Sequence, residues 1–506
     1  MKYAVSGSQM KQIDQDTIER IGIPSLVLME RAALAVAEAV ERLLGDRPGN
    51  GPVLAVCGTG NNGADGIAAG RILWNRGYDV TVLLAGNPDH ATKEHQTQQQ
   101  IARQLGVPVA EGSQVPPGSW AVIIDAVFGI GLSREVTGAY QKLLEQLSHM
   151  DKARVVAVDI PSGIHSDTGA VMGTALRADV TVTFGYRKTG HLFYPGRTFA
   201  GQVQVAETGF SDQSLANTGF AGLVPEPADL GRLPSRRPDG NKGTFGKLLV
   251  IAGSRGMSGA AWLSALAAYR IGAGLVKLLT VEDNRQILQT QLPEAVFAGY
   301  DPEKAMEAPD RFCQMIAGEV DWADAVVMGP GLGKSPCAGL LAETVLSRVQ
   351  VPLVLDADGL NLVAASPGLE HFLSENVVVT PHMGEMVRLS GRSMEQLKAD
   401  PLGEARDYSR RTGAVCVLKD AVTVTAGRDG TVWINPSGSS AMAKGGSGDV
   451  LAGIIGGLLV QGANHLEGAA LGVYLHGLAG EAAAGQNPAC LLAHEIADAL
   501  EKVRYA

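Results

Sequence analysis

The stretch "VLAVCGTGNNGADGIAAG", residues 53–70, decides the fold of the first half of the chain. Residues 53–57 form an apolar run that predicts a buried strand, and a helical pattern follows the glycines. Gly58, Gly60 and Gly63 fall at the G-x-G-x-x-G spacing of a dinucleotide-binding loop. A strand, a glycine loop and a helix in this order indicate a parallel α/β sheet that collects its ligands at the carboxyl ends of its strands.

The second strand does not complete the pattern of a nicotinamide-dependent dehydrogenase. Such a site needs an acidic residue about 20 positions further on, where it holds the ribose. Here the second strand ends in "VLLAGNPD" (82–89), with Ala85 and Gly86 at that position and Asp89 several residues late. A tight strand-to-helix turn explains the glycines equally well, so this motif alone does not identify a cofactor.

The composition is that of an ordinary globular protein, with 45% hydrophobic and 19% charged residues among 506. A net charge of −10 argues against a nucleic-acid-binding groove and against binding to an anionic membrane. The N-terminal stretch "MKYAVSGSQMKQIDQDTIER" turns polar too early for a signal peptide. The stretch "DVLAGIIGGLLVQGA" (449–463) is too short to span a bilayer, which favours a buried helix. Five well-separated cysteines favour reduced thiols over zinc, so we expect a soluble, cytoplasmic protein.

The pattern of strands divides the chain into two α/β halves. In the first half we expect a parallel sheet covered on both faces, with strands at 53–57, 79–85, 121–125, 154–159, 179–184 and 202–206 and an amphipathic helix at 30–44. In the second half we expect strands near 247–252, 275–280, 324–328, 352–356, 376–380, 414–418, 421–425 and 431–434. The proline-rich stretch between them predicts domains at 1–212 and 241–506 joined by a linker at 213–240.

Polar residues follow three strands of the first half, at residues 61–65, at Asp125 and at 159–162. Because the carboxyl ends of parallel strands meet at one edge, these side chains are expected to lie together. Asn62, Asp125 and Ser162 offer hard oxygen atoms and one formal charge, which suits potassium better than zinc or calcium. A helix cap or a turn explains each residue alone, but their common position favours a potassium site.

The stretch "AMAKGGSGDVLAGIIGG" (441–457) is the strongest motif in the chain. Gly445, Gly446 and Gly448 free their amides for an anion, and the following apolar helix adds positive potential at its N-terminus. Asp449 stands where a base would face the hydroxyl of a phosphate acceptor. Other strand ends of this half supply Asp356, Asp358, His382, Glu385 and Lys419. The sequence therefore predicts phosphate chemistry in the second half.

Taken in order, eight motifs make the chain resemble the bifunctional NAD(P)H-hydrate repair enzymes of bacteria: "GTGNNGADG", "DAVFGIGLSRE", "VDIPSGIHSDTG", "AGSRGMSGAA", "MGPGLG", "LDADGLN", "TPHMGE" and "AKGGSGDVLAG". The resemblance covers residues 5–210 and 225–504. It implies an α/β protein with a Rossmann-like, parallel-sheet N-terminal epimerase domain and a ribokinase-like C-terminal dehydratase domain that uses ADP. In that family the first domain interconverts the R and S hydrates of NAD(P)H, and the second dehydrates the S hydrate.

The resemblance also implies roles for particular residues. In the epimerase domain the hydrate would contact Asn61, Asn62, Gly63, Ala64, Asp65, Gly129, Ile130, Gly131, Leu132, Ser133, Arg134, Glu135 and Asp159, with Asp159 moving the proton, and potassium would bind Asn62, Asp125 and Ser162. In the dehydratase domain the hydrate would contact Ala260, Gly331, His382 and the catalytic Asp449. ADP with Mg²⁺ would lie along Lys419, Asp420, Ala421, Val422, Thr423, Gly445, Gly446 and Gly448. The expected partners are NADHX or NADPHX, ADP, and further copies of the chain in a homo-oligomer.

Two other hypotheses share part of this pattern. A vitamin or sugar kinase would use the same glycine loop, but it would transfer phosphate to a stable acceptor. Alternatively, the N-terminal half would be a non-catalytic binding module. The joint presence of Asn62, Asp65, Asp125 and Asp159 argues against lost chemistry there.

Overall fold

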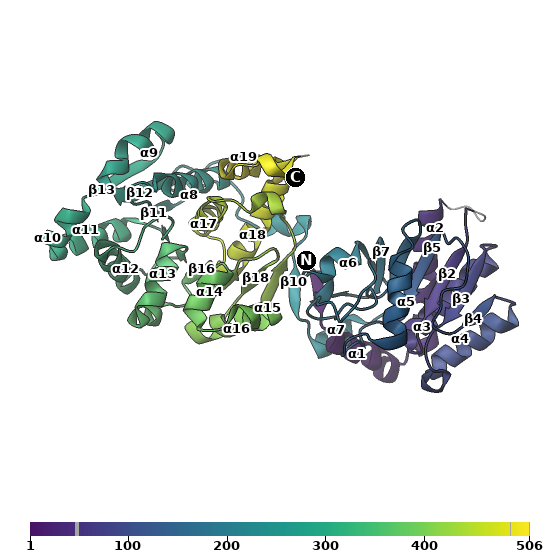
Figure 1. The fold of residues 1–506 in the computed structure, drawn as a ribbon. Coiled ribbons are helices and arrows are strands. Elements are labelled where there is room, and N and C mark those ends of the chain that lie inside the picture. The colour runs from purple at the N-terminus through teal and green to yellow at the C-terminus, as the bar shows by residue number, and fades with distance from the viewer. Residues whose placement is uncertain (46–49, 486, 505–506) are drawn as a thin grey trace. The chain divides into compact units, whose positions relative to one another are not determined.

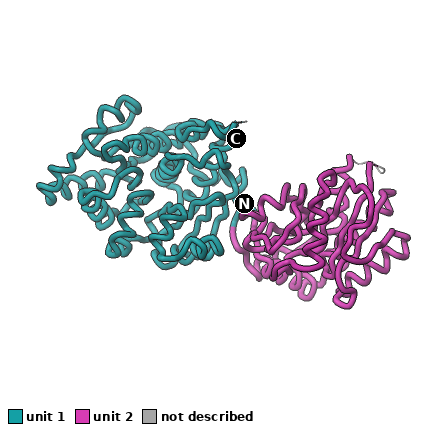
Figure 2. Tube along the Cα trace, in the orientation of Figure 1, with its two compact units in different colours: residues 1–2, 223–506 teal, residues 3–222 magenta. Residues whose placement is uncertain are grey.

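The computed structural model describes residues 1–45, 50–485 and 487–504, and the chain forms two compact units (Figures 1 and 2). One unit comprises residues 3–222, and the other comprises residues 223–506 together with residues 1–2. The boundary between the two units falls inside the segment predicted as a linker. That segment contains part of α7 (Asp212–Thr218), β10 (Gly222–Val224) and the 3₁₀ helix η4 (Pro227–Arg232). Its prolines and polar residues mark the starts and ends of short elements, such as Pro227 at the first turn of η4.

The unit of residues 3–222 is built on a parallel sheet in the order β4-β3-β2-β5-β6-β7-β9. These strands are β2 (Val53–Cys57), β3 (Val80–Leu84), β4 (Val109–Glu111), β5 (Val122–Ala126), β6 (Arg154–Val158), β7 (Val180–Phe184) and β9 (Gln202–Ala206). Alternate residues of β2 enter opposite cores, because successive strand side chains point to opposite faces. Val53 packs with α2 (Ser25–Leu44) and α3 (Asn61–Asn75), whereas Leu54 packs with α5 (Gly138–Ser148).

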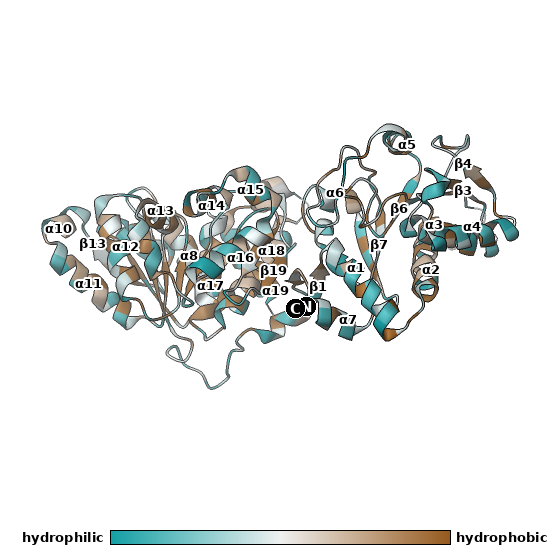
Figure 3. Ribbon diagram, turned by 90° about the horizontal axis from the view of Figure 1, so that it is seen from below, coloured by the Kyte–Doolittle hydropathy of each residue, from teal (hydrophilic) through white to brown (hydrophobic). Residues whose placement is uncertain are grey.

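The remaining elements of this unit lie around the sheet. They include α1 (Gly7–Asp16), α4 (Lys93–Gln104), which packs on α3, α6 (Gly196–Ala200), and β1 (Lys2–Val5), which pairs in parallel with β8 (Arg187–Lys188). The sheet strands carry hydrophobic residues, whereas α1 and α4 are mostly hydrophilic (Figure 3). Polar outer helices over an apolar sheet are the expected arrangement for a core covered on both faces.

The other unit has strands in the order β13-β12-β11-β14-β15-β16-β17-β18-β19-β10. They are β11 (Lys247–Ile251), β12 (Leu275–Val281), β13 (Val296–Tyr300), β14 (Ala325–Met328), β15 (Leu353–Leu355), β16 (Val377–Val379), β17 (Val415–Leu418), β18 (Thr423–Ala426) and β19 (Val432–Asn435), with β10 beside β19. The pairs β17–β18 and β18–β19 are antiparallel, and the other pairs are parallel. The carboxyl ends of β11 and β14–β17 therefore share one edge, where a site can form.

Helices cover both faces of this sheet (Figure 1). They are α8 (Ser258–Ile271), α9 (Arg285–Gln291), α10 (Pro302–Glu307), α11 (Pro309–Trp322), α12 (Pro336–Arg348), α13 (Asp358–Ala365), α14 (Met383–Ser390), α15 (Met394–Ala399), α16 (Pro401–Thr412), α17 (Ser447–Leu459), α18 (His465–Ala484) and α19 (Ala493–Val503). The residues of α17 from Val450 to Leu459 are all buried, which confirms the buried helix expected there. Within the described ranges, no helix has the length and apolar character needed to span a bilayer.

The predicted strands coincide with observed ones to within two residues at each end. The strands that the sequence did not indicate are β1, β4, β8, β10 and β13. Four of these have two to four residues, and β13 is an edge strand with Val296 exposed. Short or exposed strands lack the continuous apolar run on which the prediction rested.

Candidate active sites

The glycines of the 58–63 loop serve backbone packing. A Cβ on Gly63 would lie 1.8 Å from the carbonyl oxygen of Gly58, and one on Gly58 would lie 2.1 Å from that of Val127. Gly60 has open space around it and an ordinary negative φ of −86°. Close backbone approach between β2, α3 and the segment after β5 therefore explains two of the three fingerprint glycines without any nucleotide.

Asp125 and Ser162, two of the predicted potassium ligands, lie in direct contact. The Ser162 amide donates to Asp125 Oδ2 at 2.8 Å, and the Ser162 hydroxyl donates to Oδ1 at 2.5 Å. Burial raises the pKa of Asp125 to about 6, and the hydrogen bonds from Ser162 only partly offset it. The third ligand, Asn62, packs against the loop after β5, since a Cβ on Gly129 would lie 2.9 Å from Asn62 Oδ1. Its buried Nδ2 has no hydrogen-bond partner among the described residues.

Asp159 follows β6 and forms a buried ion pair with Lys188. Lys188 Nζ lies 2.5 Å from Asp159 Oδ1, and Thr183 Oγ1 donates to the same oxygen at 2.9 Å. Burial raises the pKa of Asp159, but the charge and hydrogen bond of Lys188 outweigh it, so the net pKa lies below its usual value. Asp159 also has φ of +64°, a strained conformation for a residue with a side chain.

His191 holds the backbone of this aspartate in place. Its Nδ1 accepts the amide of Lys188 at 3.1 Å, so the proton is on Nε2, which donates to the carbonyl oxygen of Asp159 at 2.9 Å. Burial and then the charge of Lys188 lower the pKa of His191 to about 3. The imidazole is therefore neutral, and it orients Asp159 without competing for its proton.

Two further carboxyl groups interact electrostatically with Asp159. Burial and then the negative charge of Asp159 raise the pKa of Asp65 on α3 and of Asp14 on α1. The predicted loop at 129–135 follows β5, with Leu132 buried and residues 133–135 exposed. This edge of the sheet thus combines one ionised carboxylate, two carboxyl groups that retain protons more readily, and an exposed loop.

In the other unit, the glycine loop (residues 445–449) leads into α17. Gly446 has φ of +98°, which glycine adopts without strain, whereas a Cβ on Gly445 would meet no atom within 4 Å. Packing therefore does not require a glycine at 445. The amide N–H groups in the first turn of α17 have no acceptor within the helix, so an anion can bind there. Burial, and then the charge of Asp356, raise the pKa of Asp449 to about 7, with Lys419 opposing them.

Lys419, which was predicted to contact the nucleotide, lies beside the glycine loop. Its Nζ is 2.7 Å from Asp356 Oδ1, and a Cβ on Gly448 would lie 3.4 Å from the same Nζ. The other residues of the predicted nucleotide segment form the turn between β17 and β18, with Asp420 and Ala421 exposed and Val422 buried. The structure therefore brings Lys419, Gly448 and Asp449 together.

Of the predicted hydrate contacts, Gly331 follows β14, His382 follows β16, and Ala260 lies in the first turn of α8. Gly331 and Ala260 are adjacent, since a Cβ on Gly331 would lie 2.9 Å from that of Ala260. His382 caps α14, and its Nδ1 accepts the amide of Gly384 at 3.0 Å. Its Nε2 lies 3.3 Å from Glu385 Oε1, and burial raises the pKa of Glu385 to about 7.

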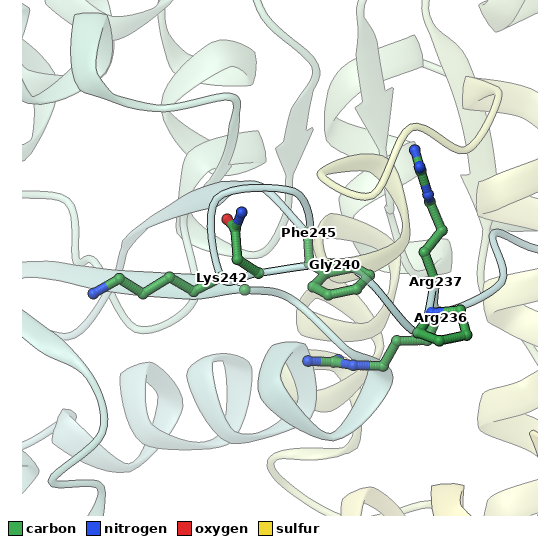
Figure 4. A pocket seen from close by; sticks show the side chains of 8 residues that line it. Arg236, Arg237, Gly240, Lys242 and Phe245 are labelled. Carbon is green, nitrogen blue, oxygen red and sulfur yellow. The ribbon is translucent and has the colours of Figure 1, made fainter.

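A separate cavity of about 460 Å³ lies next to the amino ends of β11 and β12, where Phe245 and Gly274 line it (Figure 4). Its Arg236 stacks 4.1 Å from the centre of the Phe245 ring and donates to the carbonyl of Gly272, which ends α8. Arg237 and Lys242 extend away from that ring in Figure 4. None of the residues predicted to bind a ligand lines this cavity, and Arg236 has a clear role in capping a helix.

Sequence reasoning missed Lys188, Thr183 and His191. The sequence signal was a lysine and a histidine close behind an apolar strand, in "VTVTFGYRKTGH" (180–191). Within the described ranges no three His, Cys, Asp or Glu side chains cluster in a way that could hold a metal ion.

Comparison with known proteins identifies both halves of the chain. A family model described as YjeF-related protein N-terminus matches residues 25–190, and one described as NAD(P)H-hydrate dehydratase matches residues 248–502. A solved structure from Enterococcus faecalis V583, described as a ribokinase-like superfamily protein, is 30% identical with a TM-score of 0.50 and covers 56% of this chain and 96% of its own. Fold and sites together define a two-domain α/β enzyme whose second domain is ribokinase-like.

Relatives of similar length show which family of two-domain α/β enzymes the chain belongs to. A bifunctional NAD(P)H-hydrate repair enzyme Nnr from Moorella thermoacetica is 37% identical over 497 residues, 96% of this chain and 93% of the relative. A protein of the same description from Thermofilum pendens is 37% identical over 487 residues, 94% of this chain and 91% of the relative. The chain belongs to the family of bifunctional NAD(P)H-hydrate repair enzymes, as the order of its motifs predicted.

Proposed function

We propose that the chain repairs hydrated nicotinamide nucleotides in two steps, each carried out by one unit. The unit of residues 3–222 interconverts the R and S hydrates of NADH and NADPH. The unit of residues 223–506 dehydrates the S hydrate and converts ADP to AMP and phosphate. The observation that carries the proposal is Asp449, a half-buried carboxyl group with a pKa raised to about 7, at the helix N-terminus of the glycine loop.

The first unit contains both a base and acids for epimerisation. Inversion at C6 of the hydrated ring removes a proton from one heteroatom and returns one to another, whether the hydroxyl leaves or the ring opens. Asp159 is ionised because Lys188 stabilises its charge, so it accepts the proton. Asp65 has a raised pKa and supplies one. Carboxyl groups whose environments shift their pKa values in opposite directions divide the acid and base roles in this way.

Asn62, Asp125 and Ser162 fit a potassium ion. The pKa of Asp125 near 6 shows a buried carboxyl that a neighbouring positive charge would keep ionised. The amide of Asn62 is buried with its Nδ2 unpartnered among the described residues, and rotation by 180° would turn its oxygen to that position. When bound, potassium supplies a fixed positive charge at the ends of β5 and β6. Ser162 would then orient Asp125 through the two hydrogen bonds it already donates.

In the second unit, Asp449 takes the proton from the C6 hydroxyl as that oxygen attacks the terminal phosphate of ADP, and AMP leaves. The amides of residues 445–448 and the N-terminus of α17 stabilise the charge on the transferred group. The resulting C6 phosphate ester then loses phosphate from C6 and a proton from the adjacent ring carbon, which restores NAD(P)H. The hydrate would bind at Gly331 and His382, which follow β14 and β16, and at Ala260 in the first turn of α8.

The test uses a mixture of R and S hydrates with ADP and Mg²⁺ and follows the absorbance of reduced nicotinamide. The parent chain is expected to consume both epimers and release one phosphate per reduced cofactor. Asp449→Asn is expected to lower dehydration by about 10²–10⁴-fold, the usual contribution of a general base, and to leave epimerisation unchanged. Dehydration by this variant at the parent rate would refute the assignment of Asp449.

The second candidate function for the unit of residues 223–506 is that of a vitamin or sugar kinase, because such a kinase would use the same glycine loop to bind the transferred phosphate. It predicts a stable phosphorylated product and no recovery of absorbance, so the same assay separates the two functions. The homo-oligomer and the cytoplasmic location expected from the sequence stay predictions.

A further inference from the structure

Asp356 is a buried carboxylate that lies outside the predicted ligand set. It follows β15, and 1% of the residue is exposed. Its Oδ1 accepts hydrogen bonds from Thr380 Oγ1 and from Lys419 Nζ, both at 2.7 Å. The three residues follow β15, β16 and β17, which are neighbours in the sheet. Asp356 is therefore held at the middle of the edge where the glycine loop lies.

The partner of Asp356 has hydrogen-bonding capacity left for a ligand. An ammonium group has three N–H donors, and Asp356 accepts one of those of Lys419. The side chain of Lys419 is 19% exposed, so solvent reaches it. A Cβ on Gly448 would lie 3.4 Å from Lys419 Nζ and 3.8 Å from Asp356 Oδ2. The glycine at 448 thus leaves open space directly beside the ion pair.

We propose that Asp356 is a positioning residue for phosphoryl transfer: it holds Lys419 beside Gly448, so that the ammonium and the N-terminus of α17 meet the same phosphate. This inference rests on the proposed dehydratase function. Lysine carries a point charge on a flexible side chain. A hydrogen bond from one of its N–H groups to Asp356 holds the ammonium in place beforehand, so less orientational freedom is lost when phosphate binds. Asp449 then faces the hydroxyl of the acceptor next to the phosphate that Lys419 holds.

The backbone beside Asp356 supports a positioning role. Ala357 has φ of +49° and ψ of −115°, a strained conformation that glycine adopts more readily. It joins Asp356 to Asp358, whose Oδ2 accepts the amide of Gly333 at 2.9 Å. A purely structural ion pair between β15 and β17 would need no such strain in the residue that follows.

The charges around Asp449 provide a readout of how close the ion pair lies to the catalytic base. Asp356 and Asp358 raise the pKa of Asp449, and Lys419 lowers it. Asp356→Asn removes a negative charge and keeps an oxygen for Thr380 and Lys419, so the acidic limb of dehydration should move to lower pH. Lys419→Met removes the positive charge, so the limb should move to higher pH. Because these charges act on Asp449 whatever the role of the pair, the limb shifts report how close the pair lies, and positioning is read from kcat and the KM for ADP.

The experiment measures kcat and the KM for ADP across pH for the full chain, Asp356→Asn and Lys419→Met. Asp356→Asn is expected to lose about 100-fold in kcat, the size of effect that small misplacement produces, with opposite limb shifts in the two variants. Thr380→Val is the matched variant: it removes a hydrogen bond to Asp356 but no charge, so its limb should stay at the parent pH.

Epimerisation by the same variants reports whether the chain remains intact, because the other unit performs it. Thermal unfolding with and without ADP reports whether the second unit still folds and binds nucleotide. A parent-level kcat of Asp356→Asn would overturn the positioning role of Asp356, and so would unmoved limbs or limbs that move in the same direction. If Asp356→Asn does not fold, the comparison of Lys419→Met with Thr380→Val decides in the same way. Failure of the parent chain to regenerate reduced cofactor would instead overturn the proposed function.

Discussion

Each unit of this chain places an aspartate at the carboxyl edge of its sheet, but the two aspartates have different charge environments. Asp159 contacts its lysine directly, with Lys188 Nζ at 2.5 Å, and its pKa lies below the usual value. Asp449 lies near Lys419, but that lysine is bonded to Asp356, and the pKa of Asp449 is raised to about 7. The position of one lysine therefore decides whether a buried carboxyl is ionised at neutral pH or near its midpoint.

The glycine loops differ in a related way. Gly58 and Gly63 are required by backbone contacts, because a Cβ on either would lie within 2.1 Å of a carbonyl oxygen. Gly445 has no atom within 4 Å of the place of a Cβ. Packing therefore explains Gly58 and Gly63, but it explains neither Gly445 nor Gly60 at the N-terminus of α3.

The largest expected effect comes from Lys188→Met. This variant would leave Asp159 without a directly bonded lysine, which is the situation of Asp449 in the second unit. Removal of one member of a buried ion pair costs about 3–5 kcal/mol in the free energy of unfolding. Because burial alone raises the pKa of Asp159, the carboxyl should also become protonated and epimerisation should be lost. The measurements are thermal unfolding and epimer ratio by chromatography.

The exposed Lys142 on α5 offers a matched control for this variant. Lys142→Met should change stability by no more than about 0.5 kcal/mol, as for an ordinary surface position. Parent-like unfolding and epimerisation in Lys188→Met would contradict the role assigned to the ion pair.

The next effect is a difference between the pH profiles of the two activities. Asp449 acts as a base, so its deprotonated form is active, and kcat of dehydration should fall about tenfold per pH unit below its pKa near 7. Asp159 has a lowered pKa and stays ionised over the same range, so epimerisation should show no acidic limb from it there. Both activities are measured on one protein sample. An identical acidic limb in the two profiles would contradict the comparison.

The smallest expected effect concerns potassium. At a concentration 100 times its Kd, a ligand of the folded state adds about 2.7 kcal/mol to stability. Potassium chloride should therefore raise the Tm of the first unit relative to sodium chloride, and the gain should shrink as pH falls through about 6, where Asp125 takes up a proton. Asp125→Asn should abolish the difference between the two salts. If Asp125→Asn keeps the parent response to potassium, Asp125 is not a potassium ligand.

Much of the sheet architecture was predictable from sequence, because buried parallel strands are continuous apolar runs. The run at 53–57 matches β2 at both ends. Strand β8, which carries Lys188, has two residues and no periodicity to detect. The ion pair it forms joins residues 29 positions apart, and sequence spacing gives no distance across such a separation. The contact between Asp125, near the end of β5, and Ser162, after β6, was predictable because these strands are neighbours in one sheet.

The segment predicted as a linker contains short elements of secondary structure. Prolines and polar residues at 213–240 suggested the connection between the domains, and α7, β10 and η4 contribute residues to that segment. Proline at the first turn of a helix and glycine at its end are as typical of short elements as of linkers.

The two strained backbone positions have a consequence for how this chain can evolve. Among the described non-glycine residues, Asp159 and Ala357 have positive φ, and one lies at each site. Selection for heat resistance alone would favour glycine at 357, which relaxes the backbone at the cost of a looser joint between two carboxylates. At 159 the same relaxation would delete the carboxylate itself. Lineages that abandon repair are therefore expected to drift toward glycine at these positions, and lineages that depend on it are not.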